Sequence, residues 1–440
     1  MKRNNSINRD IKMVKDIKKN IPVLRFPEFQ NDGEWIAKPI KDIAKTFSGG
    51  TPTVGNSDYY GGSIPFIRSG EITKSTTDLF ITELGLSSSS AKIVEEGTIL
   101  YALYGATSGE VAISKIRGAI NQAILAIIPK SRKYVVNYIY YFLKHQKAQI
   151  LSKYLQGGQG NLSGAIIDNL SIAFPCDYKG NISDVEQTKI ADCFVSIDKE
   201  FDATKRKLVL LKEHKKGLMQ RLFPAKGKTS PEIRFPEFIG TKEWTPKQLG
   251  FIGETFGGLS GKSAEDFGTG KPFVTYKQVF NSSEIDFSEC ALVQVSENEV
   301  QNSLQYGDIL VTMSSETPDE VGYTAVVTNK NIPECYLNSF CFIYRLFDDE
   351  SIDTKFLIYL FSNDAYRAAV VRIAQGITRF NISKTKFKEI ELVIPENKNE
   401  QIKIAETLSS VDKQIAEYDK KIKALELHKK GLMQQLFPKL

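Results

Sequence analysis

Two short motifs in the second half of the sequence contain residues that could hold a phosphate or a catalytic metal. The stretch GGLSGKS at Gly257–Ser263 resembles a phosphate-binding loop, in which a Gly-rich turn and a Lys hold a nucleotide. Its first Gly would have to stand at position 256, which is Phe256, so the spacing is one residue short. The triplet Pro318–Glu320 lacks the nearby carboxylate-x-Lys of a nuclease site. Neither motif supports catalysis by this chain.

Residues for base methylation and for proton transfer are also missing from the sequence. Amino-methyltransferases hold a flipped-out base with an Asn/Asp-Pro-Pro-aromatic motif, and no Pro-Pro occurs in the 440 residues. The histidines are His145, His214 and His428, and the last two are copies of each other in a repeated segment. Duplication in a helical segment favours packing or docking over general base catalysis. We expect no catalytic residue and no metal site in this chain.

Two stretches without Asp or Glu could instead bind the phosphates of a nucleic acid. The first runs from Val111 to Ile167 and the second from Ala365 to Lys388, and an offset of 220 residues aligns them. A basic surface binds a phosphate backbone because neutralised phosphates release their counterions. The alternative is an ordinary solvated face, which two stretches at equivalent positions disfavour. The cations are Lys115, Arg117, Lys130, Arg132, Lys133, Lys144, Lys147 and Lys153 in the first stretch, and Arg367, Arg372, Arg379, Lys384, Lys386 and Lys388 in the second.

The total charge of the chain says less than this local pattern. The net charge is +6, and residues 1–20 alone hold seven Lys or Arg against Asp10 and Asp16, which predicts a basic N-terminal arm. Residues 241–399 hold 15 basic and 22 acidic side chains, so a nucleic-acid face there must be confined to one side. Five cysteines without a CxxC pair, no membrane-length apolar run and no secretory signal indicate a reduced, cytoplasmic protein.

The chain is a tandem duplication. The sequence LRFPEF at Leu24–Phe29 returns as IRFPEF at Ile233–Phe238, and each copy is followed by a Glu-Trp pair. The sequence HKKGLMQRLFP at His214–Pro224 returns as HKKGLMQQLFP at His428–Pro438, within a longer match that begins at Glu186 and Glu400. The boundaries of the two halves are similar, and their interiors have diverged.

The repeated tails read as two long helices with an apolar stripe. Apolar residues recur at alternating steps of four and three, as in a coiled coil, and Thr204, Lys215 and Lys429 interrupt the stripe. We expect the two helices to pair in antiparallel orientation, and the alternative is that each packs on its own domain. The stripe residues are Ile190, Phe194, Ile197, Phe201, Leu208, Leu211, Leu218 and Leu222 in the first helix, and Ile404, Leu408, Val411, Ile415, Tyr418, Ile422, Leu425, Leu432 and Leu436 in the second.

Each interior reads as an α+β domain with the same order of segments. A Gly turn leads into β-rich runs at Glu95–Ser114 and Gln305–Val327, and further strands follow at Ala119–Pro129 and Tyr336–Leu346. Helical stretches come next, at Asn137–Leu155 and Lys355–Ala374. The short sequences GNLS (160–163) and FNIS (380–383) then stand at equivalent places.

Together these features resemble the specificity subunit of type I restriction–modification systems. The resemblance rests on the RFPEF…EW start of each half, on FSGGTPTVGNSDYYGGSIPFIRSGEI at Phe47–Ile72, and on EQTKIA…HKKGLMQRLFP with its second copy. It covers nearly the whole chain from Ile21, although Phe256–Val279 departs from the GGTP…YYGGSIPFIR pattern. It implies two α/β target recognition domains of an α+β fold, separated by two long antiparallel coiled-coil helices and related by a pseudo-two-fold axis.

The resemblance also implies a domain layout and a set of partners. Each recognition domain would read one half of a bipartite asymmetric site in double-stranded DNA, while the helices set the spacer and dock two modification (methyltransferase) subunits. Restriction subunits would join that complex. S-adenosylmethionine, ATP and Mg would act on the partner subunits, with no cofactor in this chain. The expected layout is a basic arm (1–20), recognition domain 1 (21–185), helix 1 (186–224), linker and recognition domain 2 (225–399), and helix 2 (400–440).

Candidate DNA contacts follow from side-chain chemistry and position. Base edges in the major groove are read by Arg, Lys, Asn, Gln, Ser and Thr. Our candidates for reading bases are Ser48, Thr51, Thr53, Arg68, Ser69, Tyr104, Thr107, Ser108, Lys262, Tyr276, Lys277, Gln278, Ser314, Ser315 and Thr317. Our candidates for holding the DNA backbone are Lys115, Arg117, Lys144, Lys147, Lys153, Gln159, Asn161, Ser163, Arg367, Arg372, Arg379, Asn381, Ser383, Lys384 and Lys386, including the loops Gly157–Ser163 and Gly376–Ser383.

Two other functions remain open from the sequence. The first is an adaptor in which two β-rich modules bind proteins across a coiled-coil spacer, without DNA. The second is a self-sufficient enzyme, against which the missing motifs argue.

Overall fold

The computed structural model describes residues 21–155, 161–317, 320–348, 351–376 and 379–438. The predicted basic arm (1–20), Gln159 and part of each predicted backbone-binding loop lie outside these residues. The chain forms two compact units, one of residues 1–204 with 421–440 and the other of residues 205–420. Each unit therefore contains one diverged interior, the beginning of one long helix and the end of the other.

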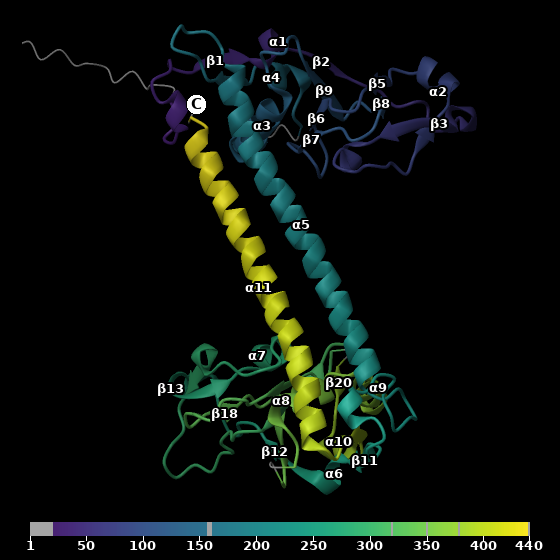
Figure 1. The fold of residues 1–440 in the computed structure, drawn as a ribbon, viewed down its shortest axis with the longest axis vertical. Helices are drawn as coiled ribbons and strands as arrows, with labels where there is room; N and C mark the ends of the chain where they lie inside the picture. The colour runs from purple at the N-terminus through teal and green to yellow at the C-terminus, as the bar shows by residue number, and fades with distance from the viewer. Residues whose placement is uncertain (1–20, 156–160, 318–319, 349–350, 377–378, 439–440) are drawn as a thin grey trace, which may run out of the picture. The chain divides into compact units, whose positions relative to one another are not determined.

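The described residues of the first unit form three sheets, which Figure 1 draws in purple to blue. The main sheet is antiparallel, with strand order β2-β9-β6-β7, and a mixed sheet has the order β4-β3-β8-β5. A third pair joins β1 to β10. The strands are β1 Ile36–Pro39, β2 Ala44–Ser48, β3 Tyr60–Ile67, β4 Phe80–Ile81, β5 Lys92–Val94, β6 Ile99–Ala102, β7 Val111–Ile113, β8 Gly118–Ile120, β9 Ile124–Pro129 and β10 Ser171–Phe174; the helices of this interior are α1 Ile40–Ile43, α2 Glu83–Ser87, α3 Val136–Leu155 and α4 Gly164–Asp168.

The second unit repeats this framework. Its main sheet has the order β12-β19-β15-β17, its second sheet β14-β13-β18, and its end pair joins β11 to β21. A short pair of β16 with β20 has no counterpart among the described sheets of the first unit. The strands are β11 Thr245–Gln248, β12 Gly253–Gly257, β13 Phe267–Val274, β14 Ala291–Val293, β15 Ile309–Thr312, β16 Ser314–Ser315, β17 Thr324–Val326, β18 Tyr336–Leu337, β19 Cys341–Leu346, β20 Phe380–Asn381 and β21 Glu391–Ile394; the helices of this interior are α6 Leu249–Ile252, α7 Tyr276–Asn281, α8 Thr354–Leu360, α9 Asp364–Ile373 and α10 Lys384–Lys388.

Equivalent glycines begin the central strands of both units. Gly97 and Gly307 have φ angles of +85° and +83°, a conformation that residues with a Cβ rarely adopt. Each makes the tight turn that leads into β6 or β15. The α+β class and the duplication that the sequence predicted are therefore confirmed by matching strand orders.

One predicted helix is interrupted in the structure. The stretch Lys355–Ala374 was expected to be continuous, but it forms α8 and α9 with a break at Phe361–Asn363. The Asn363 side chain accepts a hydrogen bond from the Tyr366 backbone N–H and so begins a new helix. The equivalent stretch of the first unit has no such cap and forms α3 without a break.

The repeated tails are α5 (Asp184–Leu222) and α11 (Lys398–Leu436), of 39 residues each. Both begin two residues before the predicted starts at 186 and 400. Within each unit the start of one helix packs against the end of the other, as drawn for α5 in teal and α11 in yellow in Figure 1, so they run antiparallel. Every residue of the predicted apolar stripe is buried or half-buried.

The Leu-Phe-Pro end of each tail enters the core of the unit in which it lies. Phe437 packs against Tyr138, Phe142 and Phe194, with ring centroids 5.3 to 5.6 Å apart. Phe223 packs in the same way against Phe356, at 5.6 Å. The repeated end of each tail therefore contributes to the core of the unit in which it lies.

Candidate nucleic-acid interface

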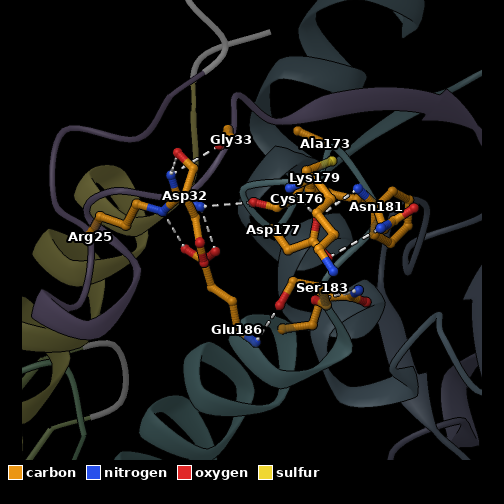
Figure 2. A network of polar contacts seen from close by, with 12 residues as sticks. Arg25, Asp32, Gly33, Ala173, Cys176, Asp177, Lys179, Asn181, Ser183 and Glu186 are labelled. Carbon is orange, nitrogen blue, oxygen red and sulfur yellow. Dashed lines mark hydrogen bonds and ion pairs between the residues drawn. The ribbon is translucent and has the colours of Figure 1, made fainter.

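A buried ion pair fixes the N-terminal segment of each unit to the beginning of a long helix. Arg25 Nε and Nη2 donate to the two carboxylate oxygens of Glu186 at 2.8 and 2.7 Å, and Nη1 donates to the carbonyls of Asp32 and Gly33 (Figure 2). The Glu186 side chain has no exposed area. The pair therefore joins the RFPEF segment rigidly to α5.

The second unit contains an equivalent buried ion pair between Arg234 and Glu400. Arg234 Nε and Nη2 donate to the carboxylate at 2.7 and 2.8 Å. Trp244 Nε1 donates to the same carboxylate at 3.1 Å, so Glu400 has one more partner than Glu186 has in the first unit. These two ion pairs explain why the repeat retains an Arg in RFPEF and a Glu at the start of the later motif, which reads EQTKIA in the first half and EQIKIA in the second.

A second repeated cluster fixes the end of the opposite helix. In the first unit, Tyr141 donates its hydroxyl to Asp198 at 2.8 Å, and Lys429 forms an ion pair with the same carboxylate. Burial lowers the pKa of Lys429, whose ammonium also lies over the Tyr141 ring at 5.2 Å. These contacts cross from α5 to α11 and to α3.

Its counterpart in the second unit joins Tyr359, Asp412 and Lys215. The Tyr359 hydroxyl donates to Asp412 at 2.9 Å, and Lys215 Nζ lies 2.6 Å from that carboxylate. Burial, together with the hydrogen-bonded aspartate, raises the pKa of Tyr141 and of Tyr359. The lysines that interrupt the apolar stripe are thus the cations of two equivalent ion pairs.

Several loops meet at one edge of the first unit's sheets, which we call the first loop edge. Strand register places Ser48 opposite Leu125, Ala102 opposite Ile124, and Ile67 beside Ile120. The loops that follow β2, β3, β6 and β8 therefore start close together. They carry the predicted residues Ser48, Thr51, Thr53, Arg68, Ser69, Tyr104, Thr107 and Ser108, none of which is fully buried.

Three of these residues form side-chain hydrogen bonds within the protein. Ser108 donates its hydroxyl to the Leu103 carbonyl at 3.1 Å. Thr51 donates its hydroxyl to Gln122 Oε1 at 2.6 Å. Arg68 is bound in a bidentate manner to the buried Glu71, with Nε–Oε2 and Nη2–Oε1 distances of 3.0 Å, and its side chain remains 47% exposed. Burial by itself raises the pKa of Glu71, but hydrogen bonds from Arg68 and from backbone N–H groups outweigh it and lower the pKa to about 2.

Sequence reasoning missed Gln122 at this edge. The side chain is exposed and lies in the turn between β8 and β9, next to Asn121. A Gln amide can pair with adenine in the major groove. An Asn-Gln pair between two apolar strands indicates a turn that carries amide side chains. This pattern could have identified Gln122 from the sequence.

The second unit has an equivalent second loop edge, where Gly257 lies opposite Phe342, Thr312 opposite Cys341 and Val274 beside Leu337. Lys277 and Thr317 are exposed there, whereas Ser314 and Ser315 are buried and Tyr276 is half-buried. Two other predicted residues have side chains that are buried and already bound to partners within the protein. Gln278 is 7% exposed and donates to the Asp286 carbonyl, and the Lys262 side chain is 8% exposed and pairs with Glu299 at 2.5 Å.

The residues predicted to bind the DNA backbone differ in exposure and in whether they already form ion pairs or hydrogen bonds within the protein. Lys115, Lys153, Asn161, Ser163, Arg372, Arg379, Asn381 and Ser383 are exposed. Ser163 and Ser383 also accept hydrogen bonds from the first turns of α4 and α10. The engaged residues are Arg117 with Glu95, Lys147 with Glu110, Lys386 with Glu389, Lys388 with Glu254, and Arg367 with the carbonyls of Val321 and Gly322; Lys384 is half-buried with its Nζ beside Gly257.

A groove lies against the helix pair of each unit. The first-unit groove has a volume of about 800 Å³ and includes Lys115 and Lys144, which therefore lie beside α5 and α11. The second-unit groove has a volume of about 450 Å³. Seven positions recur at an offset of 214 residues, namely Lys430 and Lys216, Lys429 and Lys215, Met433 and Met219, Gln434 and Gln220, Glu426 and Lys212, Asp198 and Asp412, and Phe201 and Ile415.

Within the described ranges no group of three or more His, Cys, Asp or Glu side chains could hold a metal ion. None of the helices that the structure describes has an apolar stretch long enough to cross a membrane.

Comparison with known proteins identifies the family. The chain is 29% identical over 274 residues to the Type I restriction enzyme MjaIX specificity subunit of Methanocaldococcus jannaschii, covering 58% of this chain and 60% of that relative. It is 23% identical over 429 residues to the MjaVIII specificity subunit of the same organism, covering 94% and 93%.

Two solved structures share the fold. One is the S subunit of a type I restriction–modification system from M. genitalium, with a TM-score of 0.59 at 16% identity, covering 96% of this chain and all of that one. The other comes from a study of complex assembly and conformational transition of the type I R-M system, with a TM-score of 0.52 at 15% identity, covering 92% and 97%. The family model for the type I restriction modification DNA specificity domain matches residues 32–213 and 241–427. With both halves matched, this chain belongs to the type I restriction–modification DNA specificity family.

Proposed function

We propose that this chain is the non-catalytic specificity subunit of a type I restriction–modification complex, and that each unit reads one half of a bipartite, asymmetric DNA site. The observation that carries the proposal is one framework built twice with different loops at the same edge. The order of the main sheet is the same in both units, while the loop after β6 and the loop after β15 differ in length and charge. A shared framework with different reading loops suits two different half-sites.

The basic residues beside these loops support double-stranded DNA as the ligand. Arg379 and Asn381 are exposed next to the second loop edge, and Asn161 and Ser163 are exposed at the equivalent place in the first unit. Contacts to phosphates would position the duplex, while the loop side chains read base edges. The ion pairs that engage Lys147 and Arg117 reduce the number of cations offered to DNA but leave this exposed set.

The two grooves support docking of two copies of one partner, the modification subunit. Each groove presents the two Lys, the Met and the Gln of the repeated HKKGLMQ sequence beside an aspartate of the other helix. One surface of the modification subunit could therefore dock twice. Restriction subunits, S-adenosylmethionine, ATP and Mg belong in this proposal to the assembled complex and not to the specificity chain.

The experiment that tests the function is methylation mapping in cells that express this chain with its neighbouring modification subunit. Single-molecule sequencing should find methylated adenine in one bipartite motif with a fixed spacer. Replacing residues 33–185 by the equivalent domain of a relative should change one half-site and leave the other half-site and the spacer intact. A purified complex that methylates no motif would contradict the proposal and would favour an adaptor without DNA.

The grooves are tested separately by paired substitutions. Met433→Glu should remove one modification subunit from the complex and Met219→Glu the other, because each places a carboxylate in one groove. The double variant should bind none, as measured by the mass of the complex in solution. Leu427→Glu, which changes an exposed residue of α11, serves as the control. Retention of both partners by the double variant would exclude the grooves as docking sites.

A further inference from the structure

A cavity of about 410 Å³ opens at the second loop edge, at the end of β15. Tyr276, Phe280, Ser314, Glu316, Glu320 and Arg379 are among the residues that line it. These residues come from α7, from the segment after β15 that includes β16, and from the position just before β20. The cavity therefore stands where three predicted DNA-contacting segments meet.

Ser314 is a buried polar group without a partner in this cavity. The residue is 8% exposed, and no described residue forms a hydrogen bond with its hydroxyl. Its backbone carbonyl accepts from the Tyr276 hydroxyl at 2.8 Å, which fixes the position of the serine. Since buried polar groups in proteins are nearly always satisfied, an unpaired hydroxyl that lines a cavity indicates a polar ligand.

Two of the side chains that line the cavity are aromatic and lie close together. The rings of Tyr276 and Phe280 are nearly parallel, at an interplanar angle of 13° and a centroid distance of 6.2 Å, and Phe280 contacts Tyr323 at 4.8 Å. The Arg367 guanidinium lies 4.6 Å from the centroid of the Tyr323 ring. Burial raises the pKa of Tyr276, which keeps its hydroxyl a donor. These aromatic side chains could pack against a planar ring.

Two other lining residues of the cavity offer hydrogen-bond acceptors. Glu316 and Glu320 are both exposed toward solvent, and Glu320 Oε2 accepts a hydrogen bond from the Ser315 hydroxyl at 3.1 Å. A carboxylate only accepts hydrogen bonds, and in the major groove it pairs with the exocyclic amino group of cytosine or adenine. Guanine and thymine present acceptors at the corresponding places and would be repelled.

We propose that Glu316 and Glu320 select a base with an exocyclic amino group, adenine or cytosine, at one position of the half-site that the second unit reads. This inference rests on the proposed function. Ser314 supplies a second hydrogen bond to that base, and Arg379 holds an adjacent phosphate. Two of the acidic residues that make residues 241–399 net acidic would then contact DNA directly.

The first unit lacks this device. Tyr104 and Gly105 occupy the places of Ser314 and Ser315, because Leu103 and Met313 make equivalent backbone hydrogen bonds to Ala123 and Phe340. The loop from Tyr104 to Gly109 is shorter and contains no acidic residue. The two half-sites should therefore differ in how this position is read.

The test begins with the motif of the wild-type complex and then compares E316Q, E320Q and the double variant by the same sequencing. The double variant should relax one or two adjacent positions in the half-site that stays unchanged when residues 33–185 are exchanged. The other half-site and the spacer should not change. E297Q, which alters an exposed glutamate of the same unit outside the cavity, should reproduce the wild-type motif.

A binding measurement identifies the chemical group. Duplexes in which the selected base lacks its amino group, with purine in place of adenine or 2-pyrimidinone in place of cytosine, should bind the wild-type complex about tenfold more weakly. The double variant should show no such difference between the two duplexes. An unchanged motif in the double variant, or an amino-group effect equal in both proteins, would overturn the inference while leaving the proposed function intact. A wild-type complex with no bipartite motif would remove both.

Discussion

Lys429 of α11 forms an ion pair with Asp198 of α5, and the same carboxylate accepts a hydrogen bond from Tyr141 of α3. This cluster joins three helices of the first unit at one point. Its copy, formed by Lys215, Asp412 and Tyr359, does the same in the second unit. The two clusters make the stability of each unit depend on a residue from the end of a helix that starts in the other.

Replacing Lys429 by Met should destabilise the first unit by about 1–3 kcal/mol, because Asp198 loses its cation while the pair is largely shielded from water. Hydrogen exchange should then accelerate in α3 and at the end of α11, with no change in the second unit. Lys215→Met should give the equivalent result in α8 and at the end of α5. Lys430→Met, at an exposed neighbouring position, is the control and should leave exchange unchanged. Equal acceleration in both units would contradict the local role of the cluster.

Replacing Arg25 by Met should cost about 3–5 kcal/mol of unfolding free energy in the first unit, because Glu186 is left buried without its cation. The double change Arg25→Met with Glu186→Met should recover most of that loss, as measured by urea denaturation. Arg234→Met should cost less, since Glu400 keeps its hydrogen bond from Trp244. Lys189→Met removes an exposed ion pair with Glu28 and should cost under about 1 kcal/mol. If the double variant lost as much unfolding free energy as Arg25→Met, the unpaired Glu186 carboxylate would not be the cause of the destabilisation.

Glu71 should make the first unit sensitive to acid. Its pKa is about 2 in the folded protein against an ordinary value of 4.5, so the unfolded chain takes up its proton first as the pH falls. The stabilisation is complete above pH 4.5 and is lost between pH 4.5 and 2, by up to about 3 kcal/mol. Glu71→Gln should be less stable at neutral pH and should lose less stability over that range. Parallel pH curves for the two proteins would contradict the assignment.

Gln122→Ala should relax one position of the half-site read by the first unit. The side chain is exposed at the first loop edge, and its amide also holds Thr51 in place. Methylation mapping should show the change at one or two adjacent positions. The second half-site, mapped in the same cells, is the internal control. A change in the second half-site or in the spacer would show that Gln122 does not read bases in the first.

The sequence predicted the parts of this fold that depend on local pattern. The apolar stripes predicted α5 and α11 to within two residues at their starts, and α3 matched the predicted stretch closely. The break before α9 depends on one capping side chain, Asn363, within an otherwise helical pattern. That detail could have been found from the Ser-Asn-Asp sequence, which favours a helix start.

The candidate DNA contacts depend on pairing between distant strands, which one sequence does not determine. Gln278 turns toward the Asp286 carbonyl, 8 residues along the chain, and Lys262 turns toward Glu299, 37 residues along the chain. Gln122 was missed for the same reason, since its importance follows from the parallel pairing of β3 with β8. Residue type identified which side chains could read bases, and tertiary structure determines which of them are presented.

The packing of Phe437 in the first unit has a consequence for how this protein is made. The ribosome synthesises Tyr138, Phe142 and Phe194 early, but the ring that packs among them comes after the entire second unit, residues 205–420. The later-encoded unit is thus the first to have all its residues. During translation the earlier unit must wait with part of its aromatic core uncovered, a state in which nascent chains are prone to aggregate.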